Sequence, residues 1–434
     1  MKSVEPRPTP DVKPRVWLYT DCPVFGGADT FLVNLIQEGD MLKEFDCRLI
    51  YRSSQHFDRG LARCLRLPLS KMPVRFPDRD GWLATLNRAV PFAPARLLFK
   101  VLYRLLDWPL FAWEALRLYK LFARGRPRLV HVNNGGYPGA LSCQAAVVAA
   151  AWARVPAVLL TVNNITRPVR RPWEWPELCI DRLVLRSCRR IVTASQAARQ
   201  ALIRRGFPQD RILTIANGVR RPEELRPPAE VRRDLGLAPE QTVLLMTAFF
   251  EPRKGHRVLV EAIDLLAKAG RLSPQSRIVL IGDGPERETV ESLTRELGLS
   301  AHFLFLGYRH DAEQILNAAD ILILPSVSHE DMPLIILDAM ALGKPVVSSA
   351  VAGIVEEVED GRTGLLVPPA DPQSLASAIA SLLSSSDRRQ AMGRAGKERF
   401  EQHFRAELAA RRYQELYQAV LAEKPGIGGA HAKE

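Results

Sequence analysis

Two successive series of short β-branched segments, each alternating with helix-length stretches, constrain the fold of this chain more than any other feature. The first series lies within residues 16–216 and the second within residues 243–367. Strands separated by helical segments are typical of βαβ units, in which parallel strands form a sheet covered by helices. The sequence therefore predicts two doubly wound α/β domains. The expected strands are residues 16–19, 47–51, 129–133, 157–162, 191–194, 212–216, 243–247, 277–281, 303–306, 321–324, 345–348 and 364–367.

A polar, proline-rich segment separates the two series. Residues 220–228 read Arg-Arg-Pro-Glu-Glu-Leu-Arg-Pro-Pro, which is typical of a stiff linker. A length of 434 residues agrees with two domains, because single hydrophobic cores seldom grow beyond about 250–300 residues. We expect an N-terminal Rossmann-like domain over residues 1–218, a C-terminal one over 219–400, a last long helix over 401–423 and a disordered tail over 424–434.

Several classes of protein are disfavoured by composition. The first residues carry no apolar segment, so we expect no signal peptide, and no charge-free apolar run reaches the roughly 18 residues of a membrane span. The six cysteines form no CxxC pair and are expected to be reduced. No His, Cys and Asp cluster has metal-ligand spacing, so we expect neither a metal nor a cofactor. These features predict a cytoplasmic protein.

The net charge of +12 is divided unevenly. Residues 1–218 hold 34 Lys and Arg against 17 Asp and Glu, whereas residues 219–434 hold 26 against 31. Such asymmetry indicates an anionic partner for the first half, such as a membrane surface or a phosphorylated substrate. The basic residues lack a recognised nucleic-acid-binding module, so we expect no nucleic-acid partner.

The segment after the strand at 321–324 carries the strongest chemical pattern. Pro333 suits the start of a helix and Gly343 its end, and Asp338 is the only charge within this apolar helix. A buried carboxylate is costly without a donor, so Asp338 either forms an internal cap or ion pair or accepts hydroxyl protons of a ligand. The free backbone N–H groups of Leu334 and Ile335 would add an anion site at the helix start.

Three further loops follow expected strands. Arg253 and Lys254, in Glu-Pro-Arg-Lys-Gly after residues 243–247, suit a diphosphate, although solvated loop charges are the ordinary alternative. Gly26 and Gly27 precede a helix, where glycines let the backbone approach a phosphate or simply form a turn. His131, within the strand expected at 129–133 and just before its loop, is equally compatible with a structural and a functional role.

Together these segments resemble the family 4 retaining glycosyltransferases of cell-surface polysaccharide synthesis. Glu330, seven residues, and Asp338 in an apolar helix, followed by Ala-Met and then Gly-Lys-Pro-Val-Val, are similar to the family's Glu-x7-Glu signature. The resemblance covers residues 191–383, approximately. Its other matching segments are Ser195 and residues 217–219, 282–286, 319–321, 352–356 and 360–368.

The resemblance implies the GT-B fold, with two Rossmann-like domains facing across a cleft and a C-terminal helix that crosses back to the first domain. It implies a UDP- or GDP-sugar donor, transfer with retention to a glycan or lipid-linked acceptor, and no metal. Glu330 and Lys254 are then the expected catalytic residues, and His131 and Asn163 lie on the acceptor side. The donor-binding residues implied are Gly26, Gly27, Arg253, Lys254, Gly282, Tyr308, Leu334, Ile335 and Asp338.

Three residues depart from the family pattern. Asp338 replaces the second Glu, Phe249 falls where the family has an Arg beside the diphosphate, and Asn163 falls where many members have a His near the sugar. Arg253, next to Lys254, is the candidate for the missing guanidinium. These departures favour the main alternative, a non-catalytic basic membrane-binding protein on a degenerate GT-B scaffold. An epimerase or a phosphorylase on the same fold is the alternative among enzymes.

Residues 87–128 form the most basic aromatic stretch, with nine Lys and Arg, two acids, and Trp108 and Trp113 interleaved. A basic amphipathic helix with aromatic residues can lie in a membrane interface. The alternative is an ordinary helix that covers the sheet. The first hypothesis predicts a peripheral protein at the inner face of an anionic membrane.

Overall fold

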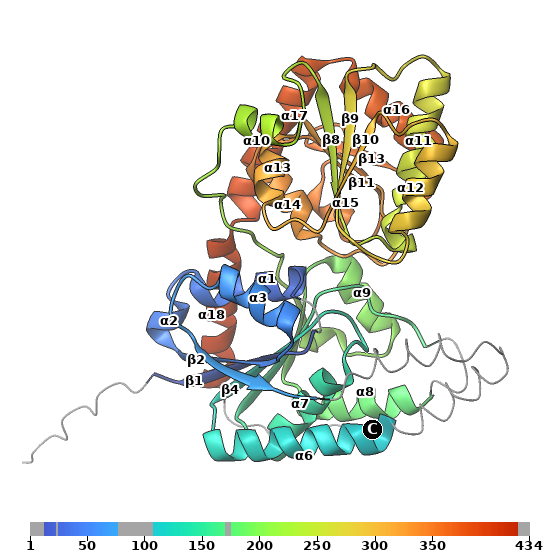
Figure 1. Ribbon diagram of the computed structural model, residues 1–434. Helices are drawn as coiled ribbons and strands as arrows, with labels where there is room; N and C mark the ends of the chain where they lie inside the picture. The colour runs from blue at the N-terminus through green and yellow to red at the C-terminus, as the bar shows by residue number, and fades with distance from the viewer. Residues whose placement is uncertain (1–12, 23–24, 77–106, 170–174, 424–434) are drawn as a thin grey trace, which may run out of the picture. The chain divides into compact units, whose positions relative to one another are not determined.

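The computed structural model describes residues 13–22, 25–76, 107–169 and 175–423 (Figure 1). The tail expected at 424–434 and residues 87–106 of the basic segment lie outside these ranges. The chain divides into two compact units: Met1–Thr193, Ala201–Leu213 and Ala410–Glu434 form the first, and Ala194–Gln200 and Thr214–Ala409 form the second.

The first unit contains a sheet of seven strands in the order β3-β2-β1-β4-β5-β6-β7. β1 pairs in parallel with β2 and β4, and the pairs β2–β3, β4–β5 and β5–β6 are parallel as well. β4 and β5 are buried along their whole length, as expected for strands covered on both faces. The strands are β1 (Arg15–Thr20), β2 (Asp46–Arg52), β3 (Ser70–Val74), β4 (Leu129–Asn134), β5 (Ala157–Val162), β6 (Arg190–Thr193) and β7 (Ile212–Thr214).

Helices cover both faces of this sheet (Figure 1). The alanine-rich α7 is buried from Ser142 to Ala150 and shares a core with α6, β4 and β5. Small side chains allow this close helix-on-sheet and helix-on-helix packing. The helices assigned wholly or partly to this unit are α1 (Gly27–Gln37), α2 (Met41–Glu44), α3 (Gln55–Cys64), α6 (Asp107–Gly125), α7 (Leu141–Trp152), α8 (Trp175–Ser187), α9 (Gln196–Arg204) and α18 (Ala406–Ala422), with η2 at Gln209–Arg211.

The second unit contains a parallel sheet of six strands in the order β10-β9-β8-β11-β12-β13. Alternate β8 residues enter two different cores: Val243 and Leu245 pack with α13 and α14, whereas Leu244 and Met246 pack with α11 and α16. The sheet is therefore covered by helices on both faces. Its strands are β8 (Thr242–Thr247), β9 (Ser276–Ile281), β10 (Phe303–Gly307), β11 (Ile321–Leu324), β12 (Val346–Ser349) and β13 (Gly364–Val367).

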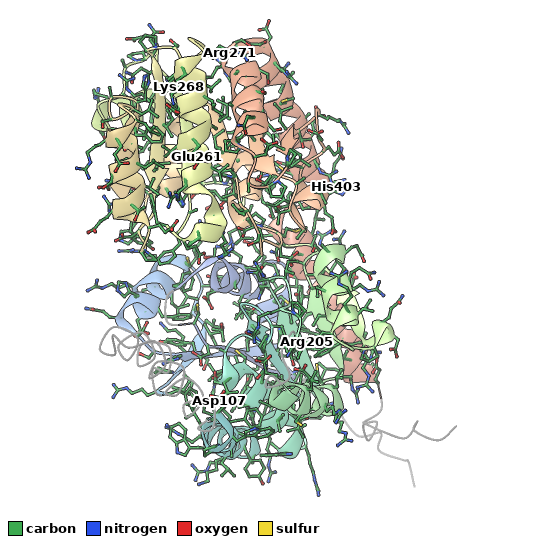
Figure 2. The ribbon with its side chains drawn as sticks, turned by 90° about the vertical axis from the view of Figure 1, so that its right-hand side faces the viewer. Asp107, Arg205, Glu261, Lys268, Arg271 and His403 are labelled. Carbon is green, nitrogen blue, oxygen red and sulfur yellow. The ribbon has the colours of Figure 1, made fainter. Side chains whose placement is uncertain are left out.

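The helices of this unit are amphipathic where they border solvent. α11 buries Leu259, Ile263 and Leu266 and exposes Glu261 and Lys268, which are labelled in Figure 2. The helices are α10 (Pro228–Asp234), α11 (His256–Lys268), α12 (Arg287–Glu296), α13 (Ala312–Ala318), α14 (Leu334–Ala341), α15 (Ile354–Glu357), α16 (Pro372–Leu383) and α17 (Ser386–His403), with η3 at Pro252–Lys254.

These observations confirm the predicted fold class of two doubly wound parallel sheets. The chain also returns to the first unit at Ala410, within α18, so the last helix crosses back as the resemblance implied. α18 starts at Ala406 because α17 ends at His403 and a short break follows. At this break the backbone of Val219 bonds to Phe404 and Ala406, which replaces helical hydrogen bonds.

Candidate functional site

Because all six strands of the second sheet are parallel, the loops after β8, β9, β10 and β11 emerge at one edge. Glu330, in the loop after β11, is 7% exposed and has three donors. Its Oε2 accepts hydrogen bonds from Lys254 Nζ at 2.5 Å and Ser326 Oγ at 3.0 Å, and Arg253 Nη1 lies at 3.4 Å. The structure therefore brings together Glu330, Lys254 and Arg253, which sequence analysis had selected from separate loops.

Arg253 and Lys254 lie on the η3 turn that links β8 to α11. Arg253 also donates to the carbonyl of His329 at 3.1 Å and pairs with Glu251 at 2.6 Å. Gly255 ends the turn with φ of 77°, and a Cβ at this position would lie 1.9 Å from the Pro325 carbonyl oxygen. Only glycine therefore allows the turn to contact the β11 loop and aim both cations at Glu330.

α14 begins beside this cluster, with Pro333 at its N-cap. Within the described chain no acceptor bonds to the N–H groups of Leu334 and Ile335, whereas Ile336 N already bonds to the Pro333 carbonyl at 3.0 Å. The helix is otherwise apolar and buries Ile336, Leu337 and Met340. Its start can accept an anion, because free N–H groups and the helix dipole favour negative charge there.

Asp338 lies one turn further along α14 and is half-buried. Among the described residues no donor bonds to its carboxylate, so the internal ion pair considered from sequence is not formed. Burial, with a smaller contribution from the Glu313 carboxylate, raises the pKa of Asp338 to about 8. A proton takes the place of the expected donor at neutral pH, and the group remains available to ligand hydroxyls.

The loops after β9 and β10 are joined to the β8 loop by backbone hydrogen bonds. Gly282 N donates to the Gly307 carbonyl at 2.9 Å, and Phe250 N donates to the Asp283 carbonyl at 2.9 Å. Gly282 has φ of 138°, and a Cβ there would lie 2.0 Å from the Ala248 carbonyl oxygen. Tyr308 and Phe249 project from this joined edge and are 63% and 56% exposed. An exposed ring at Phe249 supplies no charge where the family has its arginine.

The glycine loop of the first unit follows β1. Gly26 is the N-cap of α1, and its carbonyl accepts the N–H of Thr30 at 2.9 Å. Asp29, 1% exposed, accepts Gly26 N at 3.2 Å and the Thr20 hydroxyl at 2.7 Å. Burial raises its pKa to about 6 despite these bonds. Sequence analysis missed Asp29 as the residue that shapes this loop, although its place three residues after the cap is typical of a capping box.

Asn163 follows β5 and connects the end of this strand to the end of β4. Its Nδ2 donates to Asn133 Oδ1 at 2.8 Å and to the Asn134 carbonyl at 3.0 Å. Asn133 Nδ2 then donates to the Ala28 carbonyl, at the start of α1, at 3.1 Å. Asn163 Oδ1 is buried and accepts no hydrogen bond from the described residues. The amide thus holds the glycine loop indirectly and keeps one acceptor free.

For His131 the geometry favours the structural alternative. The ring is fully buried, with Nδ1 at 2.5 Å from the Tyr417 hydroxyl and Nε2 at 2.7 Å from Thr161 Oγ1. It stacks on Tyr413, 5.5 Å between ring centroids. Burial lowers its pKa to about 3, so it stays neutral. Both tyrosines belong to α18, and this contact anchors the last helix to the first unit.

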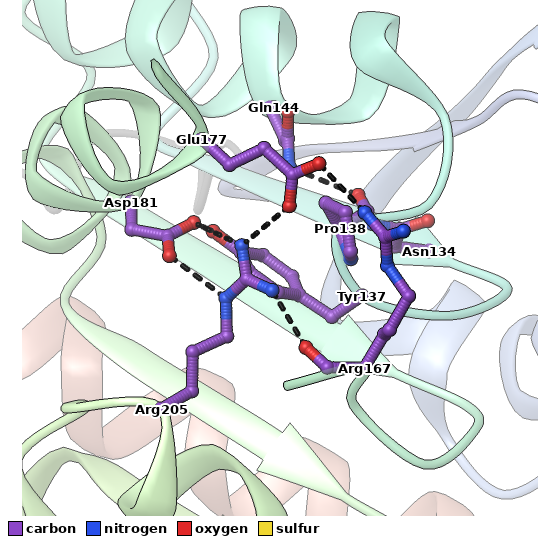
Figure 3. Close-up of polar contacts among 8 residues, drawn as sticks. All are labelled: Asn134, Tyr137, Pro138, Gln144, Arg167, Glu177, Asp181 and Arg205. Atoms are coloured by element: carbon purple, nitrogen blue, oxygen red, sulfur yellow. Dashed lines mark hydrogen bonds and ion pairs between the residues drawn. The ribbon is translucent and has the colours of Figure 1, made fainter. Parts of the chain in front are cut away.

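A buried ion network fixes the loops after β4 and β5 (Figure 3). Arg205, whose side chain is 1% exposed, donates to Asp181 Oδ2 at 2.8 Å and to the Arg167 carbonyl at 2.6 Å, and its position in the first unit is also marked in Figure 2. Tyr137, in the β4 loop, donates its hydroxyl to Asp181 at 2.7 Å. Removing one partner of such a buried pair typically costs 3–5 kcal/mol, so these loops are firmly held.

Two Rossmann-like units, with a lysine–carboxylate cluster beside a free helix N-terminus at the carboxyl edge of the second sheet, define the GT-B class of glycosyltransferases. Comparisons with known families agree. The description "Glycosyltransferase Family 4" matches residues 25–221, and "Glycosyl transferases group 1" matches residues 229–399. The chain belongs to the family 4, group 1 glycosyltransferases.

Curated relatives match mainly over part of their length. The N-acetyl-alpha-D-glucosaminyl L-malate synthase of Bacillus anthracis is 27% identical over 194 residues, which is 45% of this chain and 50% of that protein. The lipopolysaccharide core biosynthesis glycosyltransferase LpsE of Rhizobium meliloti is 31% identical over 194 residues, 45% of this chain and 54% of that protein. The match therefore spans about half the length of these relatives.

Solved structures match over nearly the whole chain. HepE of Anabaena in complex with UDP gives a TM-score of 0.72 at 20% identity, covering 93% of this chain and 100% of that chain. WaaG, a glycosyltransferase involved in lipopolysaccharide biosynthesis, gives 0.66 at 14% identity, covering 94% and 100%. At these identities the likeness establishes the fold.

Proposed function

We propose that the chain transfers a sugar from a nucleotide diphosphate sugar, UDP- or GDP-linked, to a glycan or lipid-linked acceptor with retention at the anomeric carbon. The observation that carries this proposal is the cluster of Lys254 and Arg253 on Glu330, beside the free N–H groups of Leu334 and Ile335. Solved GT-B relatives that hold UDP or UDP-glucose support a nucleotide-sugar donor.

The chemistry follows from where charge develops. When the bond between the anomeric carbon and the diphosphate oxygen breaks, the leaving group gains negative charge, which Lys254, Arg253 and the start of α14 stabilise. Preorganised groups of this kind act without reorganisation at the moment of reaction. Glu330 holds both cations in position before the donor binds. We also assign Glu330 the role of binding the hydroxyl groups of the transferred sugar.

Retention requires the acceptor oxygen to attack the anomeric carbon on the same face from which the leaving group departs. The acceptor oxygen forms the new bond to the anomeric carbon, and its proton passes to an oxygen of the departing phosphate. Such a step needs no side chain as general base. We assign Asp338 to the ribose hydroxyls and the backbone at Gly282 and Tyr308 to the base, while the first unit, with its loops after β1, β4 and β5, receives the acceptor.

Thermal melting with UDP, GDP, ADP and CDP, each also as a sugar conjugate, tests the donor class. A ligand that binds only the folded chain stabilises it by about 2.7 kcal/mol at a hundredfold excess over Kd. We expect a shift with UDP or GDP and their sugars. No shift with any nucleotide would favour the alternative, a non-catalytic membrane-binding protein in which Phe249, Asp338 and Asn163 have removed donor binding.

Lys254→Met is expected to weaken nucleotide diphosphate binding by about 10- to 100-fold, because a charge-assisted hydrogen bond contributes about 1.5–3 kcal/mol. The methionine keeps the aliphatic stem and removes the cation that contacts Glu330. The measurement is the nucleotide concentration that gives half of the maximal melting shift. Lys268→Met, which removes an exposed lysine from α11, is the control and should leave that concentration unchanged.

We also propose that the outer face of α6 contacts an anionic membrane surface. Trp113 and Leu116 are 41% and 53% exposed, and Lys120 and Arg124 lie exposed along the same helix. Large exposed apolar side chains beside cations complement an anionic lipid interface. In the part of the chain that the structure describes, no helix is long and apolar enough to cross a membrane.

Neutralising both cations by Lys120→Gln and Arg124→Gln should weaken binding to phosphatidylserine-containing vesicles about 30-fold, because each basic residue near such a surface contributes about 1 kcal/mol. Co-sedimentation measures the partition. Vesicles of phosphatidylcholine alone should capture neither protein. Equal binding of the wild type and the double variant to anionic vesicles would contradict this role for α6. The alternative, an ordinary helix that covers the sheet, would then be favoured.

A further inference from the structure

Two carboxyl groups that the mechanism above does not use lie behind the loop that carries Glu330. Asp331 is 2% exposed and Glu357 is fully buried. Neither oxygen of Glu357, nor Oδ2 of Asp331, has a hydrogen-bond partner among the described residues. Burying an ionised carboxylate without donors is strongly unfavourable, so these acids need a partner that the surrounding side chains do not supply.

The two groups are brought together by the short helix α15. Gly353, its N-cap, packs on Asp331 so closely that a Cβ there would lie 2.6 Å from Asp331 Oδ1 and 2.3 Å from its carbonyl oxygen. Glu357 ends the same helix, and among charged groups Asp331 acts on it most strongly. Asp331 Oδ1 also accepts the Ser195 hydroxyl, and Ser195 caps α9 by accepting Ala198 N at 3.0 Å.

The cations around the pair are directed elsewhere. Arg399, on α17, donates to the backbone carbonyls of Glu356 and Glu357 at 2.8 Å each and pairs with Glu359. It therefore acts on Glu357 through the main chain and leaves its carboxyl oxygens without a bond.

The remaining charges that face the pair are two further acids and their partners. Glu356 accepts hydrogen bonds from the backbone N–H groups of Gln196 and Ala197 at 2.9 and 3.0 Å. Glu330 accepts hydrogen bonds from Lys254 and Arg253. Glu330 and Glu356 add negative charge next to Asp331. The site thus gathers four acids, and no donor among the described residues reaches Asp331 Oδ2 or either carboxyl oxygen of Glu357.

We propose that Asp331 and Glu357 are a pair of buried acids that together position the Glu330 loop, and that the loop stays in place only while the pair holds a proton. Ionising both of two interacting carboxyl groups in a buried site is strongly unfavourable, and a bound proton takes the place of the missing donor. The pair is then a positioning element for Glu330, and this consequence rests on the proposed transfer function.

The electrostatics agree with the geometry. Burial, opposed by the Ser195 hydrogen bond and aided by Glu356 and Glu330, raises the pKa of Asp331 to about 7. Burial and the Asp331 carboxylate raise the pKa of Glu357 well above its usual value. For an acid whose folded pKa lies above its unfolded value, stability is lost as pH rises from the unfolded pKa to the folded one. The pair should therefore lose its proton above pH 7, and the loop that carries Glu330 should then leave its position.

The test compares the full chain with Asp331→Asn and Glu357→Gln, whose amides cannot lose a proton. Transfer from the active nucleotide sugar is measured from pH 6 to pH 9. Above pH 7 we expect wild-type transfer to fall about tenfold per pH unit, following the protonated fraction. Asp331→Asn should lose a much smaller share of its pH 6 rate at pH 9 than the wild type does, because Asp338 titrates equally in both proteins. Glu240→Gln, which changes an exposed acid, should follow the wild-type profile.

Melting without ligand over the same pH range keeps the two proposals apart. It is done in an Asp338→Asn background, since Asp338 also titrates in this range. We expect the melting temperature to fall between pH 5 and pH 8, and to fall less in the Asp331→Asn variant. If Asp331→Asn does not fold, Glu357→Gln takes its place in the comparison. Parallel profiles would overturn the carboxyl pair. Absence of transfer at every pH, with the melting difference present, would overturn the proposed function alone.

Discussion

Glu330→Gln is expected to lower sugar transfer by about 10²–10³-fold while the chain remains folded. The amide keeps the shape and can still accept from Ser326, but it cannot hold two cations by charge. Losing one preorganised group in a catalytic site typically costs a factor of that size. The measurement is initial rate with the nucleotide sugar that gives a melting shift, together with the melting temperature of the free chain.

Nucleotide binding should respond in the opposite direction. In the free chain Glu330 neutralises Lys254 and Arg253, so a diphosphate must compete with it for these cations. Removing the carboxylate charge should therefore leave the melting shift with nucleoside diphosphate intact or increase it. Glu251→Gln changes the other acid on Arg253 and should alter transfer far less. A fully active Glu330→Gln variant would contradict the proposed catalytic role.

The alternation of strands and helices was sufficient to predict the architecture, because parallel sheets buried on both faces need continuous apolar strands. Each expected strand is present, and within the residues that the structure describes β3 is the one that sequence analysis missed. It lies at the sheet edge, contains Pro73 and exposes most of its residues, so it carries no apolar run. Its pairing with β2 comes from tertiary context.

The site was only partly predictable. Adjacency of Lys254, Arg253 and Glu330 followed from parallel strands ending at one edge, but their mutual ion pairs depend on the left-handed Gly255 turn. The ambiguity of His131 could not be resolved from sequence either, because its partners Tyr413 and Tyr417 lie nearly 290 residues away. A spacing pattern contains no information about such distant contacts.

Asp338→Asn is expected to stabilise the ligand-free chain at alkaline pH and to remove most of the stabilisation by nucleotide. The folded chain raises the pKa of Asp338 from its usual 3.8 to about 8, so folding favours the protonated acid. The resulting loss of stability begins as pH rises above 3.8 and is complete above pH 8. An amide cannot ionise and avoids this loss. Allowing for partial solvent screening, we expect a gain of about 1–3 kcal/mol at pH 9 and almost none at pH 4.

Melting curves of both proteins at pH 4, 7 and 9, with and without nucleotide, measure the two effects together. A gain of 1 kcal/mol corresponds to about 2–4 °C for a domain of this size. If Asp338 serves the ribose hydroxyls, these hydroxyls favour its ionised form. The more stable variant is then also the weaker binder, because an amide cannot ionise to give the stronger carboxylate acceptor. Equal nucleotide shifts with a stability gain would make Asp338 a buried acid without a ligand. The stability that Asp338 costs at alkaline pH would then serve no ligand binding. This result would be the strongest support for the hypothesis of a degenerate, non-catalytic scaffold.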